Sequence, residues 1–246
     1  MRIALLTDIH GNREALAACL DEVDRNGVDR LIFLGDYVGY GADPAWVVDT
    51  VMTRVERGAV AIVGNHDVAA TGGIVRMNET AAISIAWTRT QIAARHEEFL
   101  RTLPLTITEG DCLYVHASAD TPDKWTYITD LFTASRSLIA TQAQATFCGH
   151  VHVPALYHLS ATGKVAGFQP VERVEIPLSR HRRWLAVIGS VGQPRDGNPA
   201  ACFAVLDNTR GTLTYVRVPY DVETAARKIH DAGLPPVLSH RLQQGY

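Results

Sequence analysis

Three apolar segments alternate with two amphipathic ones in the first 67 residues, and this alternation restricts the chain to few folds. The apolar segments, each short enough to be a buried strand, are residues 2–6, 29–36 and 58–67. Asn12 suits the start of a helix between the first two, and Asp43 with Pro44 suits the start of another between the last two. Short connections of this kind predict parallel strands joined by right-handed crossovers.

The rest of the chain changes from helical to β-rich patterns. We expect a long helical stretch over residues 78–101, a hairpin turning at residues 109–111, and helices near 130–142 and 220–233. The short β-like segments between them lie near residues 153–159, 164–168, 171–176, 184–188, 201–206 and 212–218. Apolar strands at both ends suit an α/β fold of two sheets packed face to face with helices outside. No Pro-, Gly- or Ser-rich linker interrupts residues 1–246, so we expect a single domain.

Composition excludes several classes of protein. A formal charge of −3 gives no field for general nucleic-acid or membrane-surface binding. No stretch approaches the ~20 apolar residues of a membrane span, and the first residues lack the pattern of a secretory signal. The four cysteines contain no CxxC pair, so we expect reduced thiols and a cytoplasmic protein.

Polar residues follow five of the apolar, strand-like segments directly. They are Asp8-Ile9-His10, Gly35-Asp36, Gly64-Asn65-His66-Asp67, Val115-His116 and Gly149-His150-Val151-His152. Residues two apart on an extended chain point to the same side, so Asp8 can meet His10 and His150 can meet His152. Ligands of open α/β sheets bind beyond the carboxyl ends of strands. We therefore expect these side chains to converge.

Carboxylate, imidazole and amide donors without thiolate suit manganese, with iron or zinc as alternatives. Seven candidate ligands are more than one tetrahedral ion needs. Two divalent ions sharing a carboxylate, as in hydrolytic sites with ions ~3.5–4 Å apart, fit the number better.

The five blocks, in this order, resemble the calcineurin-like metallophosphoesterase superfamily. The later segment GSVGQPRDGNPAACFAVLD, residues 189–207, resembles its bacterial phosphodiesterase-like branch. The resemblance implies a four-layer αββα sandwich of two mixed β-sheets flanked by helices. It implies one metal ion on Asp8, His10, Asp36 and His152, and a second on Asp36, Asn65, His116 and His150.

The resemblance also implies a reaction. A hydroxide bridging the two ions would attack the phosphorus of a phosphodiester or phosphomonoester in line. His66, which matches a family histidine beside the metals, would stabilise the transition state or protonate the leaving group, so His66 and Asp36 are the catalytic residues. The expected partner is a small phosphoester such as a nucleotide, with the oligomeric state open.

Departures from the family pattern bear on two alternatives. In the phosphoprotein phosphatase branch, an acid and an arginine stand where this chain has Gly39 and Tyr40. Their absence argues against a Ser/Thr-type protein phosphatase and against a dinucleoside polyphosphate hydrolase. A non-catalytic binding module on the same fold is a further alternative. It would be expected to lose metal ligands, and none of the seven is lost here.

Substrate contacts are less well defined by the sequence. Arg195 lies in a Gly- and Pro-rich loop and suits bidentate binding of phosphate. Asn12 and Ser190 are weaker candidates for substrate binding. Asp67 either pairs with His66 or caps the following segment. His96 has no partner at a telling spacing, so we expect it at the surface.

Overall fold

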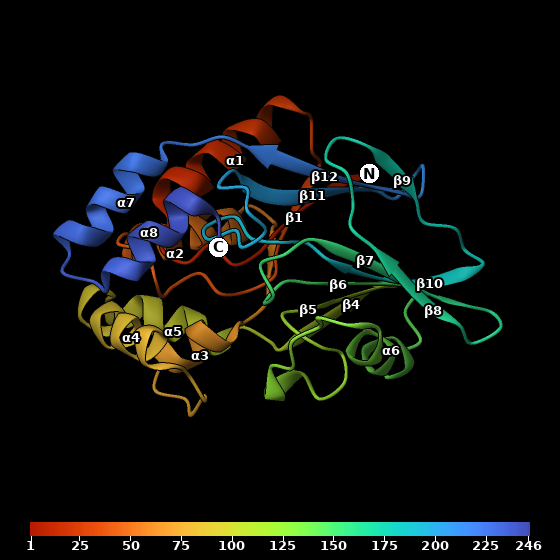
Figure 1. Cartoon of the computed structure of the whole chain (residues 1–246), viewed down its shortest axis with the longest axis horizontal. Helices are drawn as coiled ribbons and strands as arrows, with labels where there is room; N and C mark the ends of the chain where they lie inside the picture. Colours follow the sequence, from red (N-terminus) through yellow and green to blue (C-terminus); the bar gives the residue numbers. More distant parts are fainter.

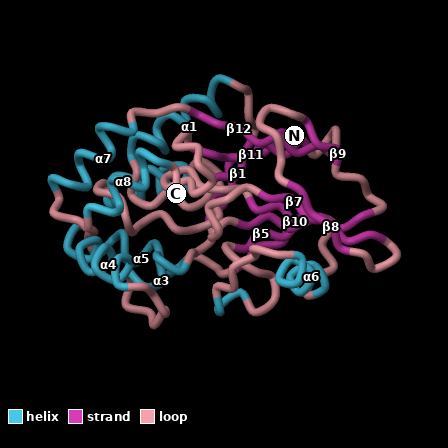
Figure 2. Tube along the Cα trace, viewed as in Figure 1, coloured by secondary structure: helices cyan, strands magenta, loops and turns pink.

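A computed structural model describes residues 1–246, which form two mixed six-stranded sheets (Figures 1 and 2). Sheet A has the order β3 (Val60–Ala61), β2 (Arg30–Phe33), β1 (Arg2–Leu6), β11 (Ala201–Asp207), β12 (Thr212–Val218) and β9 (Glu175–Pro177). Sheet B has the order β4 (Thr106–Glu109), β5 (Cys112–Val115), β6 (Ala145–Cys148), β10 (Arg182–Val187), β7 (Ala155–Ser160) and β8 (Val165–Phe168).

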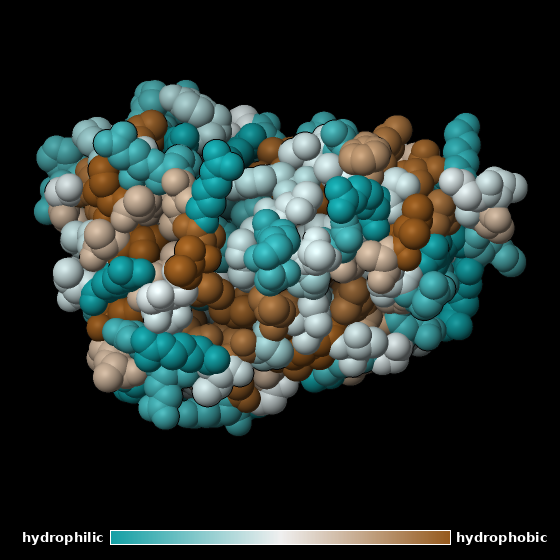
Figure 3. Space-filling view, turned by 90° about the horizontal axis from the view of Figure 1, so that it is seen from below, coloured by the Kyte–Doolittle hydropathy of each residue, from teal (hydrophilic) through white to brown (hydrophobic).

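Eight α-helices surround the sheets. They are α1 (Arg13–Arg25), α2 (Pro44–Glu56), α3 (Asn65–Ala70), α4 (Glu79–Gln91), α5 (Ala94–Thr102), α6 (Leu131–Ile139), α7 (Val222–Asp231) and α8 (Pro236–Gln244). None of them is both long and apolar enough to cross a membrane. On the side that carries α3 to α6, apolar residues gather near the middle of the surface (Figure 3). Exposed apolar side chains of α6 are Leu131, Phe132 and Ile139.

The two sheets pack face to face, and their facing side chains form one buried layer. Ile3 and Leu5 of β1 lie in the same cluster as Phe147 of β6 and Trp184 of β10. A larger cluster joins the outer face of sheet A to α1 and α2, and a smaller one joins sheet B to α6. These layers confirm the expected sandwich of two mixed sheets with helices outside.

Strand directions place the functional ends together. β1 runs parallel to β2, and β5, β6 and β10 run parallel to one another. Because the carboxyl ends of parallel strands share an edge, the segments after these strands meet there. β11 pairs with β1 in the opposite direction, and the connection from β10 to β11 therefore passes over the same edge.

Several local expectations need correction. The third apolar segment forms a strand of only two residues, and residues 78–101 form two helices separated near Ile92. His96 is buried rather than exposed, because its Nε2 meets Asp49 Oδ1 of the distant helix α2 at 2.9 Å. The carboxylate of Asp43 binds Lys228 of α7 instead of capping its own helix.

The layer between the sheets predicts a sharp contrast in stability. Phe147→Ala should lower the free energy of unfolding by about 3–5 kcal/mol, because it opens a cavity between two packed sheets. Phe132→Ala, whose side chain is 69% exposed, should change it by less than about 0.5 kcal/mol. Urea unfolding followed by circular dichroism measures both, and equal losses would contradict this account of the core.

Candidate metal centre

The first group of polar side chains joins the ends of β1 and β6. Asp8 Oδ1 lies 3.2 Å from His152 Nε2 and 3.8 Å from His10 Nε2. The two imidazole nitrogens are 3.1 Å apart. All three side chains are buried, and their donor atoms are close enough together to hold one metal ion.

The second group joins the ends of β2, β3, β5 and β6. His116 Nε2 lies 3.3 Å from Asp36 Oδ2 and 3.2 Å from Asn65 Oδ1. The ring of His150 lies at a centroid distance of 5.1 Å from that of His116. Asp36, His116 and His150 form a second cluster with ligand atoms at metal-binding separations.

Asp36 belongs to both groups. Its Oδ2 lies 3.7 Å from His10 Nε2 in the first group and 3.3 Å from His116 Nε2 in the second. Its Oδ1 accepts a hydrogen bond of 2.8 Å from the backbone N–H of His66. One oxygen thus fixes the carboxylate to the backbone, and the other faces both groups.

Hydrogen bonds behind the site aim the imidazoles. The Nδ1 atoms of His10, His116 and His152 lie 3.0, 2.7 and 2.6 Å from the carbonyl oxygens of Val38, Leu34 and Gln193. A histidine whose Nδ1–H is bound to a carbonyl presents Nε2 as an acceptor, which is the form that binds metal. Asp8 is held similarly, since its Oδ2 accepts from the Thr7 hydroxyl and the His150 N–H, both at 2.8 Å.

Backbone conformation brings the strand ends close together. Five of the seven candidate ligands, Asp8, His10, Asp36, His150 and His152, have φ between 49° and 67°. Residues other than glycine rarely adopt this left-handed conformation. Gly149 allows the close approach, because a Cβ there would overlap the carboxylate of Asp8.

Two roles were expected for Asp67, pairing with His66 or capping backbone. The structure shows that it caps backbone N–H groups. Its Oδ2 accepts from the N–H of Asp36 at 2.8 Å and of Gly64 at 2.9 Å. Its Oδ1 accepts from the N–H of Tyr37 at 2.9 Å and of Val38 at 3.3 Å. This fully buried carboxylate therefore fastens the loop of Asp36 to the start of α3, a role that spacing in sequence did not reveal.

The electrostatics of the site suit cations. Burial would raise the pKa of Asp36, but His116 and His66 lower it well below its usual range. Burial lowers the pKa of His150 to about 3, and burial together with Arg195 lowers that of His152. Ionised carboxylates and neutral imidazoles are the states that bind metal ions.

The pKa of His116 shifts in the opposite direction, because its imidazole faces the carboxylate of Asp36. Burial would lower its pKa, yet the charge of Asp36 raises it to about 9. The position that stabilises a proton between these two side chains also stabilises a cation there.

Asp8 Oδ1 and His150 Nε2 are buried without any hydrogen-bond partner. Buried polar atoms rarely lack a partner, so the donor set fits bound metal ions.

His66 and Arg195 stand beside the two groups. The ring of His66 lies at centroid distances of 4.8 Å from His10 and 4.5 Å from Tyr40. The Arg195 guanidinium carbon lies 5.7 Å from the Tyr40 ring centroid, and its Nη2 donates to Gln193 Oε1 at 2.8 Å. The structure thus brings together all seven candidate ligands, His66 and Arg195.

Asn12 and Ser190 are occupied by the protein itself. Asn12 caps α1 by accepting from the Ala15 N–H at 3.0 Å, and its amide donates to the Gly192 carbonyl at 2.8 Å. The Ser190 hydroxyl donates to the Asp8 carbonyl at 2.8 Å. Both side chains are buried, so they support the site from behind and we assign them no substrate contact.

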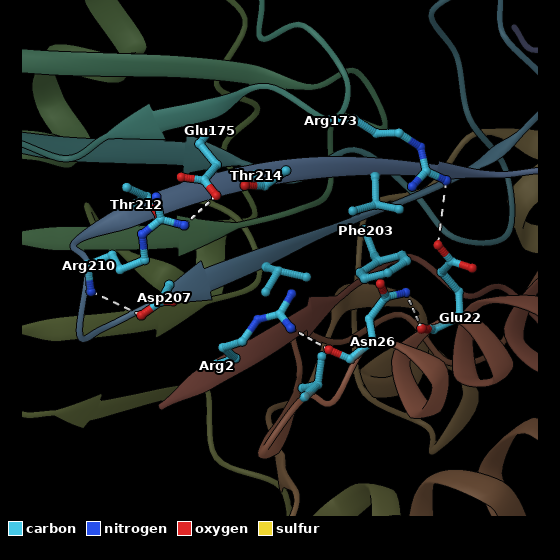
Figure 4. Close-up of a pocket in the computed structure, with 13 residues that line it drawn as sticks. Arg2, Glu22, Asn26, Arg173, Glu175, Phe203, Asp207, Arg210, Thr212 and Thr214 are labelled. Atoms are coloured by element: carbon cyan, nitrogen blue, oxygen red, sulfur yellow. Dashed lines mark hydrogen bonds and ion pairs between the residues drawn. The ribbon is translucent and has the colours of Figure 1, made fainter.

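A hollow of about 440 Å³ lies elsewhere, on the outer face of sheet A (Figure 4). Its three arginines already have partners: Arg2 with the Asn26 carbonyl, Arg173 with Glu22 and Arg210 with Glu175. It offers no free donor or acceptor cluster comparable to the strand-end groups.

Comparisons with known proteins identify the family and the fold. Residues 1–211 match the model of the calcineurin-like phosphoesterase superfamily domain. An uncharacterized protein of Methanocaldococcus jannaschii is 34% identical over 249 residues, covering 99% of this chain and 98% of that protein. The crystal structure of a metallophosphoesterase from Sphaerobacter thermophilus is 34% identical, with a TM-score of 0.88 and coverage of 100% and 99%. The crystal structure of a hypothetical protein from Pyrococcus horikoshii OT3 shares the fold. It is 18% identical, with a TM-score of 0.78, and the match covers 100% of this chain and 98% of that one.

The capping role of Asp67 predicts a large loss of stability on its removal. Asp67→Ala should lower the free energy of unfolding by at least about 3 kcal/mol, because it leaves four backbone N–H groups without their acceptor. Asp123→Ala, at a side chain that is 56% exposed, is the matched control. Urea denaturation measures both, and a loss below about 1 kcal/mol for Asp67→Ala would argue against the capping role.

Proposed function

We propose that this chain, which belongs to the calcineurin-like phosphoesterase superfamily, hydrolyses a small phosphate ester with the help of two divalent metal ions. One observation carries the proposal: Asp36 Oδ2 stands between His10 and His116, so that two donor groups share one carboxylate. A shared carboxylate suits two ions about 3.5–4 Å apart.

Each ion would have four ligands from this chain. Asp8, His10, Asp36 and His152 would hold the first, and Asp36, Asn65, His116 and His150 the second. Oxygen and imidazole donors favour manganese, with iron or zinc as alternatives. When bound, such ions supply water that ionises near neutral pH and positive charge for the phosphoryl oxygens.

His66 would act on the substrate directly. Burial lowers its pKa to about 4 although Asp36 raises it, so the imidazole is neutral near pH 7 and can donate a hydrogen bond to a phosphoryl or leaving-group oxygen. Its ring packs against Gly39, where a Cβ would overlap His66 Nδ1. No acid stands at this position, and His66 Nδ1 is buried without a hydrogen-bond partner. The absence of the acid supports a small ester over the substrates of the two alternative enzymes.

Arg195 would also bind the phosphate. Its backbone N–H donates to the His152 carbonyl at 3.1 Å, and its side chain is held by Gln193 and Tyr40. Its Nε is buried without a partner, so donor capacity remains for a phosphoryl oxygen.

Hydrolysis of bis(p-nitrophenyl) phosphate and p-nitrophenyl phosphate tests the function, with metal-stripped protein titrated with Mn²⁺. We expect turnover that requires Mn²⁺ and saturates near two ions per chain by elemental analysis. His66→Ala should lower kcat by about 10²- to 10⁴-fold with bound metal retained. Asp36→Asn should lose both metal and turnover.

The exposed His181 gives the control for this experiment, and His181→Ala should keep full turnover. Metal-loaded His66→Ala that hydrolyses both esters like the wild type would refute the role of His66. Absence of turnover on these and on nucleotide esters, with two ions bound, would instead favour the non-catalytic binding module.

Arg195→Lys tests the phosphate contact. It should lower kcat/KM for either ester by roughly 10- to 100-fold, mainly through KM, because a bidentate charge-assisted contact is lost. Arg227→Lys on the exposed face of α7 should leave both constants unchanged. Steady-state kinetics at saturating Mn²⁺ separates KM from kcat, and an unchanged KM for Arg195→Lys would exclude the contact.

A further inference from the structure

Two aromatic side chains cover the second group of candidate ligands. Both come from the loop between β5 and α6, residues 116–130. The ring of Tyr127 stacks on that of His150, with centroids 4.0 Å apart and planes inclined by 25°. The ring of Trp125 meets that of His116 edge-on, at 5.9 Å and 67°.

Tyr127 differs from Trp125 in its exposure. Its side chain is 51% exposed although one face of the ring lies on His150, so the other face is open to solvent. Aromatic residues usually bury most of their surface. Here an open aromatic face lies directly beside a candidate metal ligand.

The loop holds this ring in a fixed place. The neighbouring Ile128 is buried among residues of α6 and sheet B. The N–H of Ala119 donates to the Ser137 hydroxyl at 3.0 Å, and Arg136 pairs with Asp120 at 2.5 Å. Tyr127 is therefore presented by an anchored loop.

Backbone conformation supports a specific role for the loop. Thr121 and Trp125 have φ of 55° and 54°. Side chains of this size rarely adopt the left-handed conformation, and where it is found it often marks functional loops.

Tyr127 lies beside the second group of candidate ligands, through the contact of its ring with His150. A phosphate ester held by the two donor groups would therefore lie next to the Tyr127 ring, and a substituent on the phosphate would be within reach of its open face.

We propose that the open face of Tyr127 stacks on the base of a nucleoside phosphate ester, which makes nucleotides the substrate class. This inference rests on the proposed phosphoesterase function. Bases stack on aromatic side chains with little preference among them, because every base has a π-face. The subsite would therefore select for a base without selecting strongly between bases.

Two esters with the same leaving group test the stacking. p-Nitrophenyl thymidine 5′-phosphate and methyl p-nitrophenyl phosphate differ only in the alcohol that stays on phosphorus. We expect Tyr127→Leu to lower kcat/KM for the nucleoside ester by roughly tenfold, through KM, and to change the methyl ester by less than about twofold. Tyr127→Phe should retain the preference, and Phe168→Leu, at a 45% exposed aromatic residue of β8, should have no effect.

Binding separates failure of the subsite from failure of the phosphoesterase function. Calorimetry of Mn²⁺-loaded protein compares adenosine 5′-monophosphate with inorganic phosphate. Weaker binding of the nucleotide alone in Tyr127→Leu supports the subsite even if neither ester is hydrolysed. Equal effects of Tyr127→Leu on the two ligands and on the two esters, or no effect on any of them, would overturn it.

Discussion

A buried carboxylate that must serve two groups of imidazoles at once is the constraint around which this molecule is built. Removing Asp36 from water costs several kcal/mol unless opposite charge or hydrogen-bond donors replace the lost solvation. One oxygen of Asp36 accepts a hydrogen bond from the His66 backbone N–H, and the other faces the imidazoles of His10 and His116. These partners come from segments far apart in sequence, so the fold has to deliver the ends of β1, β2, β3 and β5 to one place.

The placement of these strand ends at the site depends on backbone that is held in an unfavourable conformation. Asp8, His10 and Asp36 turn sharply at the strand ends with positive φ. Hydrogen bonds between the two turns hold them there, from the N–H of Ile9 and His10 to the Asp36 carbonyl at 2.9 and 3.0 Å. Since packing and hydrogen bonds must outweigh this strain, the two sheets contribute the stability that keeps the strand ends in place.

The sequence predicted the parts of the structure that follow from local pattern. The strand ends were readable from their apolar runs. Asp8 and His10 meet as predicted, but through backbone of positive φ rather than through an extended chain. The expectation that His150 meets His152 was wrong, because these two residues also have positive φ and belong to different groups. His96 was misplaced because its partner Asp49 is 47 residues away in sequence. Neither the backbone contacts of Asp67 nor the exposure of Tyr127 could be predicted from the sequence. Both depend on loop conformation, which has no periodic sequence pattern. Arg195 was singled out by its residue type, which suits phosphate binding, and the structure places its backbone against His152; its contact with substrate stays a prediction.

The position of β1 also has a consequence for how the chain is made. β1 lies between β2 and β11, and Ala4 pairs with Val205. At about 5–20 residues per second, a ribosome needs roughly 10–40 s after finishing β1 to produce β11. During this time the nascent chain exposes one edge of an apolar strand, together with Asp8 and His10 but without their later partners. Folding of the central sheet is therefore a late event in synthesis, and a chaperone that shields the free edge of β1 would act in this interval.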